Sequence, residues 1–404
     1  MLKNKESGII FICWLVYAAA YTGRINFSAS NVAVIEAFSA SKSEVGLVSS
    51  FFFFAYGAGQ LINGILSKKY NARVMIFISL TASSVLNVLM PFCPDVSVMK
   101  FIWLFNGLAQ SILWSTLIKV LSTHVSDKRL PKAIFAMSTT VPTGTFIAYG
   151  LSALFVKLGI WQTVFFSSAV IMSVAAVIWL RLSEKSEKSQ PVIPEIKEKQ
   201  KTSKAILLPL FLAAFAGVAN GFIKDGINTW VPSVLYESFG LSKSFSILLT
   251  LILPLVSTLG ATGAKKTHEK VRSHSAMNFL FFSAASVAFA AILVSFRFHS
   301  LAAIMIFFVA VACIMAMSNN VITSMFALDN RAVINAGFAA GLLNTFCYTG
   351  STITTYSLGA VSQTKGWNAV FMIMFAVCII ASAVCLFGFA AEKRIKKGEL
   401  NEKS

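Results

Sequence analysis

The chain contains 404 residues, of which 56% are hydrophobic, 13% aromatic and only 12% charged, and its mean hydropathy is +0.75. Such a composition excludes a water-soluble globular protein and indicates an integral membrane protein. The formal net charge of +18 does not indicate nucleic-acid binding, because the lysines and arginines are divided among short segments between apolar runs, as the positive-inside rule describes.

Twelve apolar runs are long enough to span a bilayer, which takes about 20 residues for each crossing. The first run has a basic start and three alanines at 18–20, as a signal peptide does, but it continues beyond them and predicts an uncleaved helix. We therefore expect an all-α integral membrane protein with twelve transmembrane helices. The runs lie near 8–33, 45–66, 74–92, 100–122, 132–156, 161–182, 204–235, 244–264, 275–296, 300–325, 333–361 and 368–390.

A polar segment separates the first six runs from the last six. It mixes charges of both signs with two prolines and cannot bury a core of its own, so it predicts a linker. The resulting domains are an N-terminal six-helix half at 1–182, a linker at 183–203, a C-terminal six-helix half at 204–391 and a tail at 392–404.

Lysines and arginines cluster in every second loop, whereas the alternating loops carry mostly single cations. If every run crosses the membrane once, the clusters, the linker and the tail fall on one side, which the positive-inside rule identifies as cytoplasmic. We therefore predict a multi-pass protein with both termini in the cytoplasm.

The two halves repeat each other weakly. The segment GIWQTVFF at 159–166 is echoed by KGWNAVFM at 365–372, and Arg24 in the first run has a counterpart in Lys224 in the seventh. The matches fall in the same order along both halves, as duplication requires. Halves related by an axis along the membrane normal place equivalent residues opposite each other, so Arg24 and Lys224 are predicted to face one central cavity.

Arg24 lies inside an apolar run, where a central arginine costs about 2.5–3.5 kcal/mol on insertion scales. Tyr17, Tyr21, Arg24 and Ser28 have the spacing i, i+4, i+7, i+11 and therefore share one face of a helix. The stripe suits a polar, anionic ligand. The alternatives are a packing face between helices, and an arginine that snorkels to the headgroups, and we favour the binding site.

The motif YxxRxNFSxA around Arg24, the loop at 123–135 and the segment at 336–374 resemble the organophosphate:phosphate antiporters of the major facilitator superfamily, the family of glycerol-3-phosphate and hexose-phosphate transporters. The resemblance implies rocker-switch alternating access, in which an anionic phosphate ester is exchanged for phosphate. It also implies a site with one basic residue from the first span and one from the seventh. The matching residues here are Arg24 and Lys224, with Tyr17, Tyr21 and Tyr348.

The chain departs from this family in ways that bear on the substrate. The family usually has arginine where this chain has Lys224, and a lysine lacks the planar fork that binds phosphate bidentately. Gln60 occupies a position where family members often carry a lysine, and Thr139 or a neighbour occupies one where some carry a histidine. Lys68 lies near a position that is acidic in the superfamily. These departures weaken the case for a doubly charged phosphate ester.

Further polar residues at helical spacing extend the predicted site. Asn220, Lys224 and Asn228 are spaced i, i+4, i+8, and Asp225 lies about 100° around the helix from Lys224. Asp225 is a candidate for proton coupling, with an ion pair, for example to Lys119, as the alternative. Lys119 itself either snorkels or lies at the substrate entrance. The predicted substrate-binding residues are Arg24, Lys224, Tyr17, Tyr21, Tyr348, Asn220, Asn228, Asn344, Gln60 and Trp114.

The sequence contains no P-loop, no serine, histidine and aspartate set and no zinc spacing, so we predict neither catalysis nor a cofactor nor a metal site. None of the four histidines lies deep in a run, which argues against a histidine proton relay. The predicted function is secondary active transport of a small organic anion, a phosphate ester or phosphonate, in exchange for phosphate. The alternatives are a proton-coupled symporter of a carboxylate such as a sugar acid, and a transporter-like anion sensor. The expected partners are the anion, a counter-ion (phosphate or proton) and lipid. The resemblance also implies a monomer, because such a chain needs no second copy to form its cavity, in a bacterial-type cytoplasmic (inner) membrane.

Overall fold

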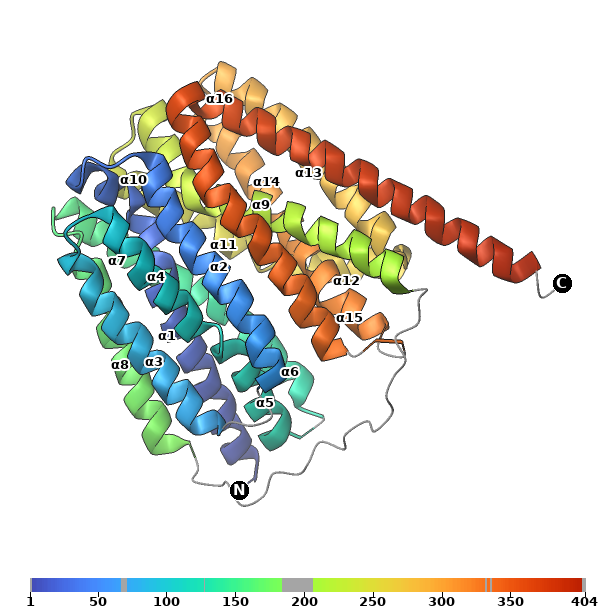
Figure 1. The fold of residues 1–404 in the computed structure, drawn as a ribbon, viewed down its shortest axis with the longest axis horizontal. Helices are drawn as coiled ribbons and strands as arrows, with labels where there is room; N and C mark the ends of the chain where they lie inside the picture. Colours follow the sequence, from blue (N-terminus) through green and yellow to red (C-terminus); the bar gives the residue numbers. More distant parts are fainter. Residues whose placement is uncertain are drawn as a thin grey trace. The chain divides into compact units, whose positions relative to one another are not determined.

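The computed structural model describes residues 2–66, 71–126, 128–183, 206–330, 333–334 and 336–401, and within these ranges every regular element is a helix (Figure 1). The predicted linker at 183–203, apart from Ser183, and Lys68 lie outside the described residues. The helices are α1 (Leu2–Ala37), α2 (Lys42–Leu66), α3 (Ala72–Leu89), η1 (Met90–Phe92), α4 (Val96–Gln110), α5 (Leu113–His124), α6 (Leu130–Ser138), α7 (Thr140–Lys157), α8 (Thr163–Leu182), α9 (Leu207–Phe239), α10 (Lys243–Thr250), α11 (Ile252–Ser257), α12 (Gly260–Lys270), α13 (His274–Arg297), α14 (Leu301–Asn320), the π-helix η3 (Val321–Met325), α15 (Phe326–Asp329) and α16 (Ala336–Asn401).

Eleven helical segments of the described chain are long and apolar enough to cross a membrane, and ten of them match the first ten predicted runs to within a few residues. The eleventh, Gly337–Glu392, covers both of the last two predicted runs. It contains Gly366 at φ 76° and ψ 175°, which lies outside helical geometry and breaks α16 where Figure 1 shows it bend. A positive φ of this size is accessible to glycine at little cost, so the residue type permits the break.

Side-chain exposure follows the apolar composition. Large hydrophobic residues are highly exposed, including Phe54 at 62%, Phe135 at 67% and Val287 at 70%. In water such a surface would be unfavourable, whereas in a bilayer it faces hydrocarbon, and the helices satisfy their own backbone hydrogen bonds. The pattern identifies a multi-pass membrane protein.

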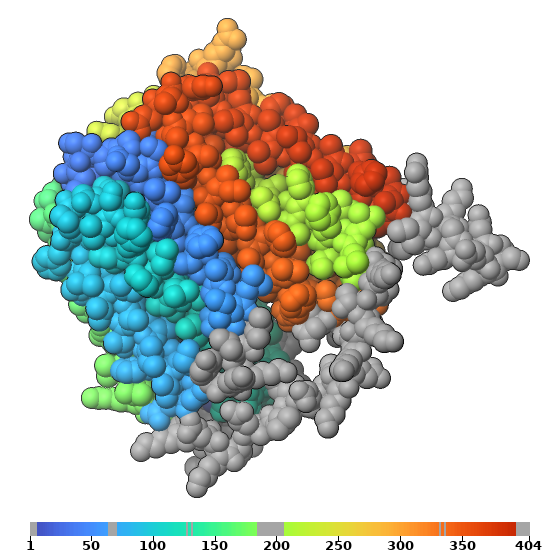
Figure 2. All heavy atoms as spheres, viewed as in Figure 1, coloured from blue at the N-terminus to red at the C-terminus, as the bar shows by residue number. Residues whose placement is uncertain are grey.

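The chain separates into two compact units. The first contains 1–199, 228–255 and 355–360, and the second contains 200–227, 256–354 and 361–404. In the first unit α1 packs against α7 and α8, and α4 packs against α2 and α3. Figure 2 shows the side chains of α2, α3 and α4 in contact along one face of this unit. In the second unit α14 packs against α12 and α13.

Glycines allow the closest helix crossings. A Cβ on Gly107 of α4 would lie 2.4 Å from the backbone oxygen of Phe52 on α2. In the second unit, a Cβ on Gly221 of α9 would lie 1.8 Å from the backbone oxygen of Cys347 on α16. Such small-residue contacts bring helix backbones together in membrane proteins, where no hydrophobic force drives helices to associate.

Candidate functional site

Arg24 of α1 is only 7% exposed, and aromatic rings surround its guanidinium group. Its Cζ atom lies 4.2 Å from the ring centre of Tyr56, 5.0 Å from that of Tyr21 and 5.4 Å from that of Phe52. A cation is attracted to the negative face of an aromatic ring, most strongly where water is excluded. These rings therefore stabilise the buried charge.

Three members of the predicted stripe, Tyr17, Tyr21 and Arg24, lie next to one another in the structure. The rings of Tyr17 and Tyr21 have centres 5.5 Å apart, and Trp114 of α5 packs on Tyr17 with ring centres 4.9 Å apart. Trp114, Tyr17, Tyr21 and Arg24 therefore form one chain of contacts in the first unit, and the three aromatic residues also belong to its hydrophobic core.

Asn26 fixes the rotation of α1 at this point. It is fully buried, and its side-chain amide donates hydrogen bonds to Asn87 on α3 at 2.8 Å and to Ser168 on α8 at 3.1 Å. The backbone oxygen of Gly23 accepts two further bonds, from Asn87 at 3.1 Å and from Asn106 on α4 at 2.9 Å. Three helices thus hold the turn that carries Arg24, and the asparagine of the YxxRxN motif acts by positioning that turn.

Phe52 and Tyr56 contact the Arg24 guanidinium, and the sequence-based interpretation did not include them. Both come from α2, and together with Gln60 they have the spacing i, i+4, i+8, which places the three on one helix face. That spacing alone does not distinguish a binding face from a packing face in so aromatic a helix. Gln60 itself lies one turn beyond Tyr56 and is half-buried. Lys119 is half-buried on α5.

Lys224 and Asp225 in the second unit interact with each other. The Lys224 Nζ atom lies 3.7 Å from Oδ2 of Asp225, and the Ser351 hydroxyl on α16 donates to the same carboxylate oxygen. Asp225 is 9% exposed. The ion-pair alternative for Asp225 therefore has a partner in its sequence neighbour Lys224. Lys224 therefore has a carboxylate close to its charge.

The remaining predicted residues have different surroundings. Asn220 is fully buried, and its amide donates to the backbone oxygen of Met315 on α14 at 2.8 Å, a helix-packing contact. Asn228 accepts a hydrogen bond from the Tyr149 hydroxyl at 3.0 Å through its backbone oxygen. Asn344 and Tyr348 lie one turn apart on α16 and are half-buried, close in sequence to the point where Gly221 of α9 meets Cys347.

Comparison with known protein families identifies the family of this chain. Residues 13–355 match the sequence model of the Major Facilitator Superfamily. The chain belongs to the Major Facilitator Superfamily. The fold is similar to the crystal structure of a bacterial homologue of the human lysosomal transporter Spinster in an inward-facing and unoccupied conformation. The TM-score is 0.78 and the sequence identity 15%, and the similarity covers 95% of this chain and 97% of that one.

Three curated relatives align with nearly the whole of this superfamily member. The glycerol-3-phosphate transporter of Bacillus subtilis (strain 168) is 26% identical, over 94% of this chain and 91% of the relative. The membrane sensor protein UhpC of Escherichia coli (strain K12) is 22% identical over the same shares, and the hexuronate transporter of Bacillus subtilis (strain 168) is 22% identical over 95% and 94%. The resemblance to organophosphate:phosphate antiporters is thereby confirmed, and the superfamily indicates a transporter rather than an enzyme.

Proposed function

We propose that this protein is a secondary active transporter that moves a small organic anion by alternating access, with a phosphate ester or phosphonate as substrate and phosphate as the exchanged ion. The observation that carries the proposal is Arg24, a buried cation on a tyrosine-lined face of the first membrane-spanning helix. A charged side chain within a membrane-spanning segment costs free energy, and such residues usually mark a substrate or ion pathway. The alignment with the glycerol-3-phosphate transporter supports the same substrate class.

In this proposal the chain crosses the membrane twelve times, because Gly366 divides the last long helix into an eleventh and a twelfth span. The spans form two six-helix halves, 1–182 and 204–391, joined by a linker at 183–203. The distribution of lysine and arginine places both termini in the cytoplasm, the C-terminal tail at 392–404 included. The protein works as a monomer in a bacterial-type cytoplasmic membrane.

Arg24 and Lys224 bind the anion from the two halves. The guanidinium and the tyrosine hydroxyls of the first span donate hydrogen bonds that replace the water lost by the anionic group. Lys224 contributes a second cation, whose ammonium group interacts with both the bound anion and the Asp225 carboxylate. A bound anion stabilises the conformations that bind it most tightly, so a filled site changes its access from one side of the membrane to the other more readily than an empty one. This preference for the filled site gives exchange.

The test is counterflow in proteoliposomes loaded with phosphate. Removal of one charged hydrogen-bonding partner costs about 1.5–3 kcal/mol, so we expect Arg24→Ala or Lys224→Ala to weaken substrate binding by about tenfold or more. The exposed cations Arg297 and Lys157 provide matched controls, and their alanine variants are expected to exchange normally. Exchange that persists at the wild-type rate in the Arg24→Ala, Lys224→Ala double variant would refute the proposal.

A second candidate, a proton-coupled symporter of a carboxylate such as a sugar acid, is favoured by Asp225. Its carboxylate is buried, lies 3.7 Å from the Lys224 ammonium and accepts a hydrogen bond from the Ser351 hydroxyl, and a buried carboxylate in a transporter is a candidate proton carrier. The alignment with the hexuronate transporter supports this substrate class. Uptake driven by an imposed pH gradient without internal phosphate, and lost in Asp225→Asn, would establish symport. Binding of the anion without any flux would instead indicate a sensor, as the alignment with UhpC allows.

A further inference from the structure

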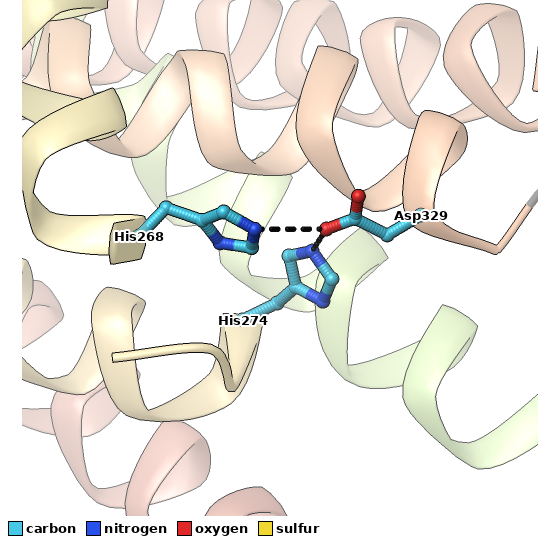
Figure 3. Close-up of side chains that lie close together, drawn as sticks. All are labelled: His268, His274 and Asp329. Carbon is cyan, nitrogen blue, oxygen red and sulfur yellow. Dashed lines mark hydrogen bonds and ion pairs between the residues drawn. The ribbon is translucent and has the colours of Figure 1, made fainter. Parts of the chain in front are cut away.

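Two histidines and one aspartate meet in the second unit, at the ends of three helices. His268 lies in the last turn of α12, His274 begins α13, and Asp329 ends α15. Figure 3 shows both imidazole rings directing a nitrogen toward the Asp329 carboxylate. The Nε2 atom of His274 lies 2.9 Å from Oδ2 of Asp329, and that of His268 lies 3.4 Å from the same oxygen.

We propose that His268, His274 and Asp329 form a binding site for a divalent transition-metal ion of the Zn²⁺ class. One ligand atom from each residue lies within 4.8 Å of the others. A tetrahedral Zn²⁺ with bonds of about 2.0–2.2 Å to nitrogen and oxygen holds its ligand atoms about 3.3–3.5 Å apart, so the observed spacing needs only small side-chain rotations to close around an ion. Two imidazoles and one carboxylate, with a position left for water, are a common ligand set for such ions.

The donor set selects the kind of ion. Imidazole nitrogen suits Zn²⁺, Ni²⁺, Cu²⁺ and Co²⁺, whereas Ca²⁺ and Mg²⁺ prefer ligand sets built from oxygen alone. The single carboxylate also offsets part of the charge of the ion, in a segment that carries Lys265, Lys266 and Lys270 on the exposed side of α12. We therefore expect Zn²⁺ to bind and Mg²⁺ not to compete.

Exposure and hydrogen bonding indicate a reversible site rather than a permanently filled one. The Asp329 side chain is 44% exposed and the His268 side chain 30% exposed, so an ion can reach them from water. Metal-binding histidines usually donate their second ring nitrogen to an acceptor, which raises affinity. Within the described residues the buried Nδ1 atom of His268 has no such partner, so the site is expected to release its ion readily.

A bound ion would join the ends of three helices, one of which is distant in sequence from the other two. α12 and α13 are adjacent in sequence, but Asp329 lies 55 residues beyond His274. The ion would therefore fasten the eighth, ninth and tenth membrane segments together at one end of the second unit. Binding would stabilise the folded protein by mass action, because the unfolded chain lacks the assembled ligands.

Titration calorimetry with ZnCl₂ on the full-length protein in detergent, purified without a polyhistidine tag, tests the proposal. We expect one Zn²⁺ per chain, a rise in the thermal unfolding temperature that EDTA reverses, and no heat with MgCl₂. Loss of a ligand in His268→Ala, His274→Ala or Asp329→Asn is expected to weaken Zn²⁺ binding by about tenfold or more. The exposed His124 of the first unit supplies the control, since His124→Ala is expected to bind as the wild type does.

Two outcomes overturn the proposal. The first is wild-type protein that binds no Zn²⁺ at micromolar concentrations, which would make the cluster a hydrogen-bonded contact only. The second is Zn²⁺ binding of equal strength in the wild type and in all three ligand variants, with unfolding temperatures in EDTA that show every variant to be folded. Visible absorption of Co²⁺ added in place of Zn²⁺ gives an independent measurement. Tetrahedral coordination by nitrogen and oxygen is expected to give absorption bands in the wild type, and these bands are expected to be lost in the three ligand variants.

Discussion

Asn26 offers the sharpest test of how the protein positions Arg24. Its amide bonds to Asn87 and Ser168 join α1 to α3 and α8, and all three side chains are fully buried. Asn26→Ala leaves the buried Asn87 oxygen without this donor, which costs about 1–3 kcal/mol in proteins generally. Hydrogen bonds within membranes average about 0.6 kcal/mol and reach about 1.7 kcal/mol in double-mutant cycles, so we expect a coupling between Asn26 and Asn87 in that range.

The measurement is a double-mutant cycle on the free energy of unfolding, from Asn26→Ala, Asn87→Ala and the double variant in mixed micelles. A turn freed to rotate also misplaces the guanidinium, so Asn26→Ala is expected to raise the substrate concentration for half-maximal exchange. Ser30→Ala provides a control, because Ser30 is buried on the same helix and its bond to Ser152 is long, at 3.3 Å. Additive effects of the Asn26 and Asn87 substitutions would refute the reasoning, since they would show that the contact contributes nothing.

Three further predictions concern other parts of the molecule. Tyr56→Phe keeps an aromatic face near Arg24 and is expected to preserve substrate affinity, whereas Tyr56→Leu is expected to lose about 0.5–2 kcal/mol of cation–π stabilisation, measured as a lower unfolding temperature. Gly221→Ala forces α9 away from a facing backbone oxygen and is expected to destabilise the protein by at least about 1 kcal/mol, whereas Gly341→Ala meets open space and is expected to be tolerated, which thermal unfolding in detergent compares directly. Burial, and secondarily a neighbouring carboxylate, raises the pKa of the Cys93 thiol to about 11 from an ordinary value of 9.0. Between these two pH values the folded protein keeps a proton that the unfolded chain releases. Alkylation of Cys93 is therefore expected to be slow at pH 8, and rapid labelling at that pH would contradict the prediction. The free energy of unfolding is expected to fall as the pH rises above about 9.

The membrane-spanning helices were predictable because their signal is local. A run of apolar residues needs no distant partner to become a helix in lipid, and the first ten predicted runs match the structure closely. The Tyr17, Tyr21 and Arg24 stripe was equally accessible, because it depends only on the helical period within one segment.

Contacts between segments distant in sequence could not be predicted in the same way. Nothing in the spacing of Tyr56 shows that its ring lies against Arg24, and nothing in Ser351 shows that its hydroxyl bonds to Asp225. Likewise, the sequence-based prediction found no metal spacing because Asp329 lies far from His274 along the chain. Such contacts depend on helix packing, which many residues of weak individual preference determine together.

Gly366 has a consequence for anyone who labels or engineers this protein. The chain reverses at a single residue, so the corner offers no loop into which an epitope or a protease site could be inserted without unwinding a helix end. A Cβ at this position would meet nothing within 4 Å, and only the backbone angle at φ 76° disfavours other residues. Topology mapping at this corner is therefore better done with a cysteine at the exposed Lys365, which leaves the backbone unchanged.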